Sequence, residues 1–204
     1  MKQVLITTGA TVTFQELMKS VLKKVFLNRL VEYKYDHMIV QYGKSEESIE
    51  FIRKLISELG NFNVKEYNNK DTGHNFEFLY DLKGILKVRC IQFDSLLIEN
   101  FTSLSDLVIS HAGTGSIIDT LRITQRDIRL IVMINEKLKD NHQSEIADAF
   151  KSLGVLESVG SNGDELLIAV DKIENDVVGE KCSRRRLPPS NGSIVERIVN
   201  EEMM

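Results

Sequence analysis

The sequence predicts an α/β fold: a Rossmann-like, mainly parallel sheet with helices on both faces. Short apolar runs alternate along the chain with segments in which apolar residues recur at helical spacing. Residues 130–134 are apolar throughout, which suits a strand buried on both faces. Residues 105–119 (SDLVISHAGTGSIID) indicate a strand, a turn of small residues and a helix. This alternation implies βαβ units, and ligands on such sheets bind beyond the carboxyl ends of the strands.

The first half of the chain has clear strand and helix patterns on either side of a weaker stretch. Thr13 and Glu16 have the spacing of a capping box before the first helix, and Gly60 is placed to end the second. Residues 62–67 could form a strand, and the turn-forming residues 68–75 are expected to be a mobile surface loop. The predicted strands are residues 3–6, 38–40 and 86–93, and the predicted helices are residues 17–31 and 49–59.

The second half continues the alternation, and Gly154 is placed to end its third helix. The carboxyl ends of parallel strands share one edge of a sheet, so the loops after Ile6, Val40, Ile109 and Ile134 should lie on one rim. The predicted strands are residues 107–109, 130–134 and 155–156, and the predicted helices are residues 95–104, 117–123, 141–153 and 166–173.

Residues 1–177 are predicted to form one domain, followed by a basic linker and an amphipathic C-terminal segment over residues 178–204. The linker holds Lys181 and three consecutive arginines, and the two prolines of the chain follow them. A basic cluster of this kind is usually a solvated linker. The alternative is a contact with a partner or with an anionic membrane surface.

Composition excludes several classes of function. The chain has 204 residues, 42% of them hydrophobic, and a formal net charge of −4, which gives no electrostatic reason to expect nucleic-acid binding. Cys90 and Cys182 are expected to be free thiols in a reducing compartment. The apolar run near the N-terminus is too short for a signal peptide, and no stretch approaches the ~20 apolar residues that span a bilayer. Neither histidine pairs nor Asp-x-Asp spacing indicates a metal, and no cofactor is expected.

Two turns are candidates for binding an anion. Gly113, Thr114, Gly115 and Ser116 open the helix after the third predicted rim strand, where small residues and free N–H groups suit a phosphate. Thr8, Gly9 and Ala10 follow the first strand and could meet the same ligand, or they could form a plain strand-to-helix turn. The chain has neither G-x-G-x-x-G nor G-x-x-x-x-G-K-[ST], which disfavours a dehydrogenase or a P-loop enzyme.

Three further features carry side chains suited to substrate binding or proton transfer. His111 ends a strand, and it is a phosphate contact, a proton-transfer group or a histidine fixed by local hydrogen bonds. Asp119 could accept hydrogen bonds from ribose hydroxyls or complement the helix dipole. Asn141, His142 and Gln143 follow the buried strand, where they either cap a helix or recognise sugar hydroxyls.

The segments SDLVISHAGTGSIIDTLR and KDNHQSEIADAF together resemble the cytosolic catalytic subunit of the two-subunit, UDP-GlcNAc-dependent N-acetylglucosaminyltransferase family. Residues 4–14, 39–43 and 86–93 are also similar to the family pattern, so the resemblance runs from near the N-terminus to about residue 154. It implies a fold equivalent to the nucleotide-sugar-binding half of a GT-B glycosyltransferase. One departure is the longer loop over residues 123–129, expected to lie away from the rim.

The resemblance implies a role for each matching position. Thr8 to Ala10 and His111 to Ser116 would face the diphosphate and the sugar, Asp119 the ribose, and Asn141 to Gln143 the sugar hydroxyls. His111 is the tentative catalytic residue, because inversion at the sugar needs a base; a residue of the partner is the alternative. The family further implies a membrane-anchored partner subunit, which recruits the chain to the cytosolic face of the endoplasmic reticulum and supplies the acceptor-binding half.

The function predicted on this basis is transfer of GlcNAc from UDP-GlcNAc to GlcNAc-diphospho-dolichol, with inversion and only together with the partner. Two alternatives stay open. One is a nucleotide-sugar-binding module that has no activity of its own and regulates or scaffolds another protein. The other is a stand-alone transferase that acts on a soluble acceptor.

Overall fold

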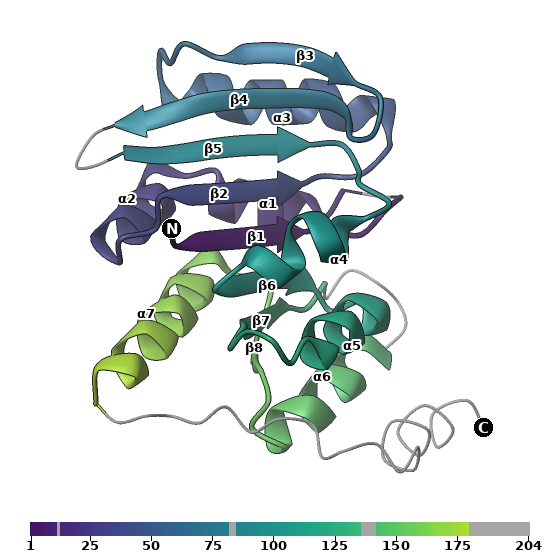
Figure 1. The fold of residues 1–204 in the computed structure, drawn as a ribbon, viewed down its shortest axis with the longest axis vertical. Helices are drawn as coiled ribbons and strands as arrows, with labels where there is room; N and C mark the ends of the chain where they lie inside the picture. Colours follow the sequence, from purple (N-terminus) through teal and green to yellow (C-terminus); the bar gives the residue numbers. More distant parts are fainter. Residues whose placement is uncertain (12, 82–84, 136–141, 180–204) are drawn as a thin grey trace.

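The computed structural model describes residues 1–11, 13–81, 85–135 and 142–179. Figure 1 shows a single sheet of eight strands in the order β3-β4-β5-β2-β1-β6-β7-β8, with helices packed against it. The strands are β1 (Gln3–Thr7), β2 (His37–Gln41), β3 (Lys65–Asn69), β4 (Gly73–Asp81), β5 (Ile85–Ile91), β6 (Leu107–His111), β7 (Arg129–Met133) and β8 (Glu157–Val159).

Six neighbouring strands, from β5 to β8 along the sheet, are parallel, so the prediction of a mainly parallel sheet is confirmed. Strand β4 runs antiparallel to its two neighbours, β3 and β5. The carboxyl ends of β1, β2, β6 and β7 therefore share one rim, as predicted. The loop over residues 123–128 precedes β7 at the opposite end of the sheet, away from the rim.

The helices cover the two faces of the sheet unequally. One apolar core lies beneath α1, α2, α3 and α7, and a second lies between the central strands and α4, α5 and α6. The bounds are α1 (Gln15–Val21), α2 (Lys24–Glu32), α3 (Glu46–Leu59), α4 (Leu97–Asn100), η1 (a 3₁₀ turn, Thr102–Leu104), α5 (Thr114–Arg122), α6 (His142–Ser152) and α7 (Gly163–Gly179).

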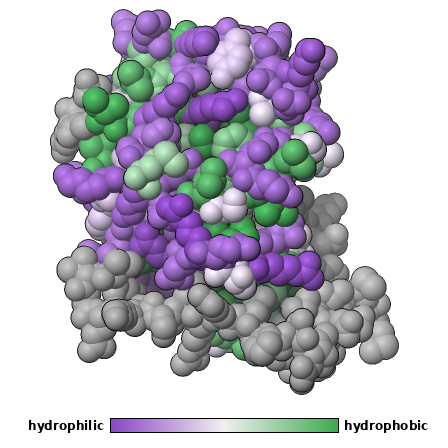
Figure 2. All heavy atoms as spheres, in the orientation of Figure 1, coloured by the Kyte–Doolittle hydropathy of each residue, from purple (hydrophilic) through white to green (hydrophobic). Residues whose placement is uncertain are grey.

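The face of β3, β4 and β5 that lies opposite α3 carries no helix (Figure 1). Its side chains are mixed: Lys65, Glu77 and Lys87 alternate with Leu79, which is 58% exposed, and Ile85, which is 65% exposed. The same face of the molecule is mostly hydrophilic, with scattered apolar side chains (Figure 2). Antiparallel sheets commonly leave one face to solvent in this way.

The single helix predicted over residues 17–31 is wrong, because two helices meet at a break. Lys23 between them has extended backbone, yet the apolar residues on both sides of the break stay buried. The apolar pattern therefore runs through the break without revealing it. The capping box is also wrong: Phe14 is the N-cap, and the Thr13 hydroxyl bonds to the carbonyl of Tyr42 and to the Ser48 hydroxyl instead.

The mobile loop predicted over residues 68–75 is wrong as well. It is the tip of a β-hairpin, in which β3 and β4 are joined by a turn of three residues. Oδ1 of Asn69 accepts hydrogen bonds from the backbone N–H groups of Asp71 and Thr72, and Asn75 is fully buried. The composition of residues 68–75 favours a turn, but the pairing of β4 with β5 makes the second half of this segment a strand.

Two shorter elements also differ from expectation. The helix predicted over residues 95–104 is only the four-residue α4 followed by η1, and the strand predicted at 155–156 lies at 157–159. Cys90 is a free and fully buried thiol, as predicted, and burial raises its pKa to about 12. Cys182 and nearly all of the predicted tail lie outside the described residues. No helix in the described ranges is long and apolar enough to cross a membrane.

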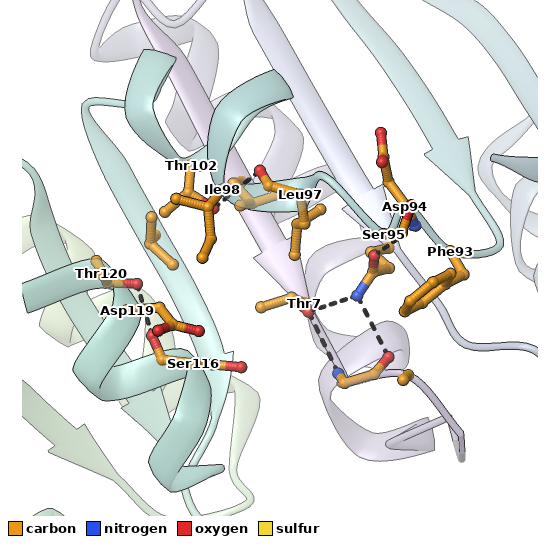
Figure 3. A pocket seen from close by; sticks show the side chains of 15 residues that line it. Thr7, Phe93, Asp94, Ser95, Leu97, Ile98, Thr102, Ser116, Asp119 and Thr120 are labelled. Atoms are coloured by element: carbon orange, nitrogen blue, oxygen red, sulfur yellow. Dashed lines mark hydrogen bonds between the residues drawn. The ribbon is translucent and has the colours of Figure 1, made fainter. Parts of the chain in front are cut away.

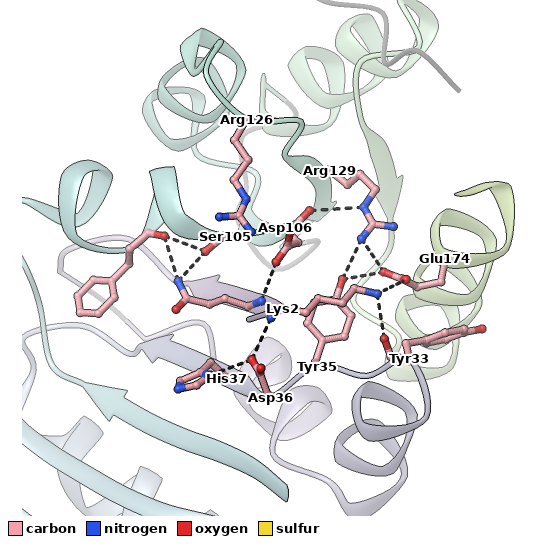
Figure 4. Close-up of polar contacts among 12 residues, drawn as sticks. Lys2, Tyr33, Tyr35, Asp36, His37, Ser105, Asp106, Arg126, Arg129 and Glu174 are labelled. Carbon is pink, nitrogen blue, oxygen red and sulfur yellow. Dashed lines mark hydrogen bonds and ion pairs between the residues drawn. The ribbon is translucent and has the colours of Figure 1, made fainter. Parts of the chain in front are cut away.

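An ion-pair network joins α7 to the amino ends of the strands, at the edge opposite the rim (Figure 4). Glu174 of α7 is 5% exposed, and its carboxylate contacts Lys2 Nζ at 2.6 Å and an Arg129 nitrogen at 2.8 Å. The Tyr35 hydroxyl donates to the same carboxylate at 2.6 Å, and burial raises the pKa of Tyr35. The network holds α7 against β1 and β7.

Candidate ligand-binding site

The carboxyl ends of the parallel strands enclose a cavity of about 240 Å³. Most of its lining comes from three segments: the turn after β1, the segment from Phe93 to Ile98 after β5, and one side of α5. Residues of β1, β6 and η1 and Gln41 at the end of β2 complete it. In Figure 3, Ser116, Asp119 and Thr120 approach from α5, opposite Phe93, Asp94 and Ser95. The cavity therefore joins elements that lie more than a hundred residues apart in the sequence, such as the turn at Gly9 and α5 at Thr120.

The turn after β1 contributes two of its three predicted residues to the cavity. Gly9 and Ala10 line it, and Gly9 has a positive φ of 84°. Thr8 is buried behind the turn, where its N–H donates to the Gln41 carbonyl at 3.2 Å and its hydroxyl lies 3.4 Å from the same oxygen. Direct contact of Thr8 with a ligand stays a prediction.

His111 lies between two glycines that leave room for its ring. A Cβ on Gly9 would lie 2.8 Å from Cε1 of His111, and a Cβ on Gly113 would lie 2.7 Å from Nε2. Real Cβ atoms essentially never come so close to another heavy atom. The missing side chain of Gly113 thus makes room for an imidazole, in addition to any room that it leaves for a ligand.

Burial favours the neutral form of the His111 ring. Burial lowers the pKa of His111, and the backbone of Thr7 opposes this more weakly. Nδ1 of His111 is buried without a hydrogen-bond partner in the described part of the chain, as is the hydroxyl oxygen of Ser110. A neutral imidazole can accept a proton, whereas it offers no positive charge to a phosphate. Proton transfer by His111 and its contact with a phosphate both stay predictions.

The first turn of α5 reaches the cavity at Ser116, whereas the predicted residues Gly113, Thr114 and Gly115 are not among those that line it. Gly113 is the N-cap, and no side chain caps the helix. A Cβ on Gly115 would meet no heavy atom within 4 Å, so the backbone there is open to approach. The unpaired N–H groups of a first helical turn and the positive end of the helix dipole suit an anion. Ser116 and Asp119 follow on the side that lines the cavity.

The segment after β5 is a wall of the cavity that our sequence analysis did not identify. Phe93 and Leu97 line it, with Asp94, whose carboxylate accepts from the backbone N–H of Leu96 at 2.7 Å and from the Asn100 amide at 2.9 Å. Residues 95–104 were predicted as a helix and were not assigned to the site. The sequence signal that could have identified this wall is the aromatic and polar run Phe93-Asp94-Ser95 at the end of a predicted strand.

The third predicted cluster is only partly described. Asn141 lies outside the described residues, and His142 and Gln143 begin α6, with side chains outside the described set. Their proposed contact with a sugar stays a prediction. The start of α6 nevertheless follows β7, whose carboxyl end lies on the same rim as the cavity.

The fold is that of the Rossmann-like half of a GT-B glycosyltransferase. Residues 3–178 match the model of the glycosyltransferase family 28 C-terminal domain, and the chain belongs to that family. The crystal structure of MurG from Acinetobacter baumannii has this fold, with a TM-score of 0.63 at 12% identity. The match covers all of this chain and 50% of that one.

Closer relatives are named UDP-N-acetylglucosamine transferase subunit ALG13. The protein from Candida albicans is 33% identical over all of this chain and 74% of its own length. The protein from Saccharomyces cerevisiae is 32% identical over 98% of this chain and 95% of its own length. The NMR solution structure of ALG13 matches with a TM-score of 0.70 and 30% identity, covering all of this chain and 98% of that one. The chain is thus a homologue of glycosyltransferase subunits.

Proposed function

We propose that this chain is the catalytic subunit of a two-subunit transferase that moves GlcNAc from UDP-GlcNAc to GlcNAc-diphospho-dolichol. This reaction is the second step in assembling the lipid-linked precursor for protein N-glycosylation. The observation that carries the proposal is the rim cavity, which Asp119 lines from the second turn of α5, a helix whose start has no side-chain cap. The names of the relatives support the donor, because they are UDP-N-acetylglucosamine transferase subunits.

The chemistry of the cavity suits each part of the donor. Apolar Leu97 and Ile98 with the Phe93 ring provide a surface for a base, and Asp119 can accept hydrogen bonds from ribose hydroxyls. The diphosphate would lie at the start of α5, beside Gly9 and Ala10. GlcNAc would then extend toward the start of α6, where Asn141, His142 and Gln143 are the proposed sugar contacts.

The proposed reaction inverts the configuration of the sugar and forms a β1,4 bond. Negative charge builds on the departing UDP, and the N–H groups of the first turn of α5 are already oriented to stabilise it. The acceptor hydroxyl must lose a proton. His111 is our candidate for the base because burial favours the neutral form of its ring, and a residue of the partner is the alternative.

We further propose that a membrane-anchored partner subunit binds the dolichol-linked acceptor and holds this chain at the cytosolic face of the endoplasmic reticulum. Two facts support a partner. The relatives are named as subunits, and the chain corresponds to half of the MurG structure. A complete GT-B site lies between two Rossmann-like halves, so a single half would leave the acceptor without a binding surface.

The test is a reconstituted assay with radiolabelled UDP-GlcNAc and a GlcNAc-diphospho-lipid acceptor, with and without the partner subunit. We expect transfer only when both chains are present. UDP-GlcNAc binding without transfer by the pair would favour a binding module that has no activity of its own. Turnover by the isolated chain would contradict the requirement for a partner and favour a stand-alone transferase.

A further inference from the structure

Gln41, the last residue of β2, is a buried side chain that no part of the proposed chemistry has used. It is 2% exposed and lies in register with Thr7 of β1 and Ile91 of β5. Its neighbours on the two sides are therefore the strands that lead into two different walls of the cavity. One wall is the turn from Thr7 to Ala10, and the other is the segment that begins at Phe93.

The carboxamide of Gln41 bonds to both walls. On the β1 side, Nε2 donates to the Thr7 hydroxyl oxygen at 3.1 Å and to the Gly9 carbonyl at 3.4 Å. On the β5 side, Oε1 accepts from the backbone N–H of Asp94 at 3.0 Å. The Thr7 hydroxyl oxygen also accepts from the backbone N–H of Gly9 at 3.2 Å. Thr7 therefore links the Gln41 carboxamide to Gly9, which lies within the turn.

The hydrogen-bond pattern fixes the orientation of this amide. Both N–H groups face acceptors and the oxygen faces a donor, so a flipped amide would set its NH₂ against the Asp94 N–H and its oxygen against the Gly9 carbonyl. The backbone carbonyl of Gln41 adds a fourth link, because it accepts from the N–H of Thr8 at 3.2 Å. One residue thus bonds to both walls of the cavity.

We propose that Gln41 is a positioning residue for the nucleotide-sugar donor: it holds the Thr7–Ala10 turn and the Asp94 segment at the spacing that the donor needs. The inference rests on the proposed function, because it assumes that UDP-GlcNAc occupies this cavity. The side chain acts through the two segments that it joins. Its loss leaves the Asp94 N–H and the Gly9 carbonyl without this partner and lets the walls move independently.

A merely structural role would predict a different result, and the chain offers a matched control. Gln3 is also a buried glutamine, 4% exposed, and its Nε2 donates to the Phe101 carbonyl at 3.2 Å and to the Ser105 hydroxyl at 3.1 Å. It lies at the amino end of β1, away from the cavity. Replacing either glutamine by methionine removes buried hydrogen bonds and keeps a side chain of similar size.

The experiment is calorimetric titration of the full chain with UDP-GlcNAc, well below its unfolding temperature, together with urea denaturation of each variant. We expect both Gln41→Met and Gln3→Met to lower stability, and only Gln41→Met to weaken UDP-GlcNAc binding, by ten-fold or more. Gln41→Asn keeps a carboxamide that is one methylene too short to reach both walls, so it should also weaken binding. It carries the test if Gln41→Met does not fold.

The possible failures can be told apart. Absence of UDP-GlcNAc binding by the unaltered chain would overturn the proposed function, and the inference with it. Binding by the unaltered chain with unchanged affinity in the Gln41 variants would overturn the inference alone. An equal loss of affinity in Gln3→Met would also overturn it, since a general loosening of the fold would then explain the effect.

Discussion

The ring of His111 occupies the space that a side chain on Gly9 would need. The two residues belong to different strand ends, β6 and β1, and a Cβ on Gly9 would lie 2.8 Å from Cε1 and 2.9 Å from Nε2 of His111. Gly9 also has a φ of 84°, which L side chains rarely adopt. The turn after β1 therefore packs closely against the ring of the candidate base, His111.

We expect Gly9→Ala to lower the free energy of unfolding by about 2–4 kcal/mol, from the positive φ and from the clash with His111. A double-mutant cycle separates the two causes. Adding His111→Ala removes the ring, so Gly9→Ala should cost less in that background, and Gly60→Ala should show no such coupling. Gly60 also has a positive φ, but the nearest atom to its Cβ lies at 3.6 Å. Equal costs with and without His111 would contradict the contact.

Gly115→Ala, unlike Gly9→Ala, should not destabilise the domain. Its Cβ would meet no heavy atom within 4 Å, and alanine favours helix, so stability should stay the same or rise by about 0.5 kcal/mol. If the donor phosphates approach the start of α5, the added methyl group should nevertheless weaken UDP-GlcNAc binding. Denaturation and titration of the same preparation test both parts. Unchanged affinity would place the phosphates elsewhere.

Asp119→Ala should weaken UDP-GlcNAc binding by about 1–3 kcal/mol, the usual effect of losing a hydrogen bond to a charged group. Asp119 lines the cavity, whereas Asp127 is exposed on the loop before β7, at the other end of the sheet. Asp127→Ala therefore serves as the control that removes a carboxylate of the same charge. Equal affinities of the two variants would refute the assignment of Asp119.

The rim was predictable from sequence because its signals are local. Each central strand is a short apolar run, and small or polar residues follow it directly, as at Gly113 and Gly9. A helix after the turn at Gly113 was predictable for the same reason, although α5 begins at Thr114, three residues before the predicted start. A parallel arrangement then brings these loops together without further information.

What could not be predicted depends on contacts between distant residues. Gln41 looks in the sequence like a polar residue at the end of a strand, and only burial between Thr7 and Asp94 gives its amide a role. The sequence likewise explained the glycine at position 113 only as room for a ligand. The structure adds a second reason, because the ring of His111 lies where a side chain on residue 113 would be. Strand β4 was missed because its pairing with β5 outweighs a turn-like composition.

The stability of the domain should depend on the protonation of His111. Burial lowers its folded pKa below the unfolded value near 6.5, so protons bind more tightly to the unfolded chain. Its contribution to stability is therefore complete above about pH 6.5 and is lost as the pH falls through the lowered pKa. Urea denaturation between pH 7.5 and 5 should show a steeper loss for the unaltered chain than for His111→Gln. Parallel curves would show that His111 titrates alike in both states.

Glu174→Gln should destabilise the domain without changing the affinity for UDP-GlcNAc. It removes the shared carboxylate from Lys2 and Arg129, whose side chains are only 29% and 19% exposed. Breaking such a partly buried pair leaves cations uncompensated, so we expect a cost of about 2–4 kcal/mol in the free energy of unfolding.

Glu58→Gln is the matched control for this change. Glu58 is 59% exposed and lies 3.9 Å from Lys54 Nζ, so the same substitution there should change stability by less than about 0.5 kcal/mol. Denaturation in urea measures both variants, and titration with UDP-GlcNAc tests the separation of the network from the rim. A cost no larger than that of Glu58→Gln would show that α7 is held by its apolar face alone. Altered affinity would show instead that the amino ends of the strands communicate with the cavity.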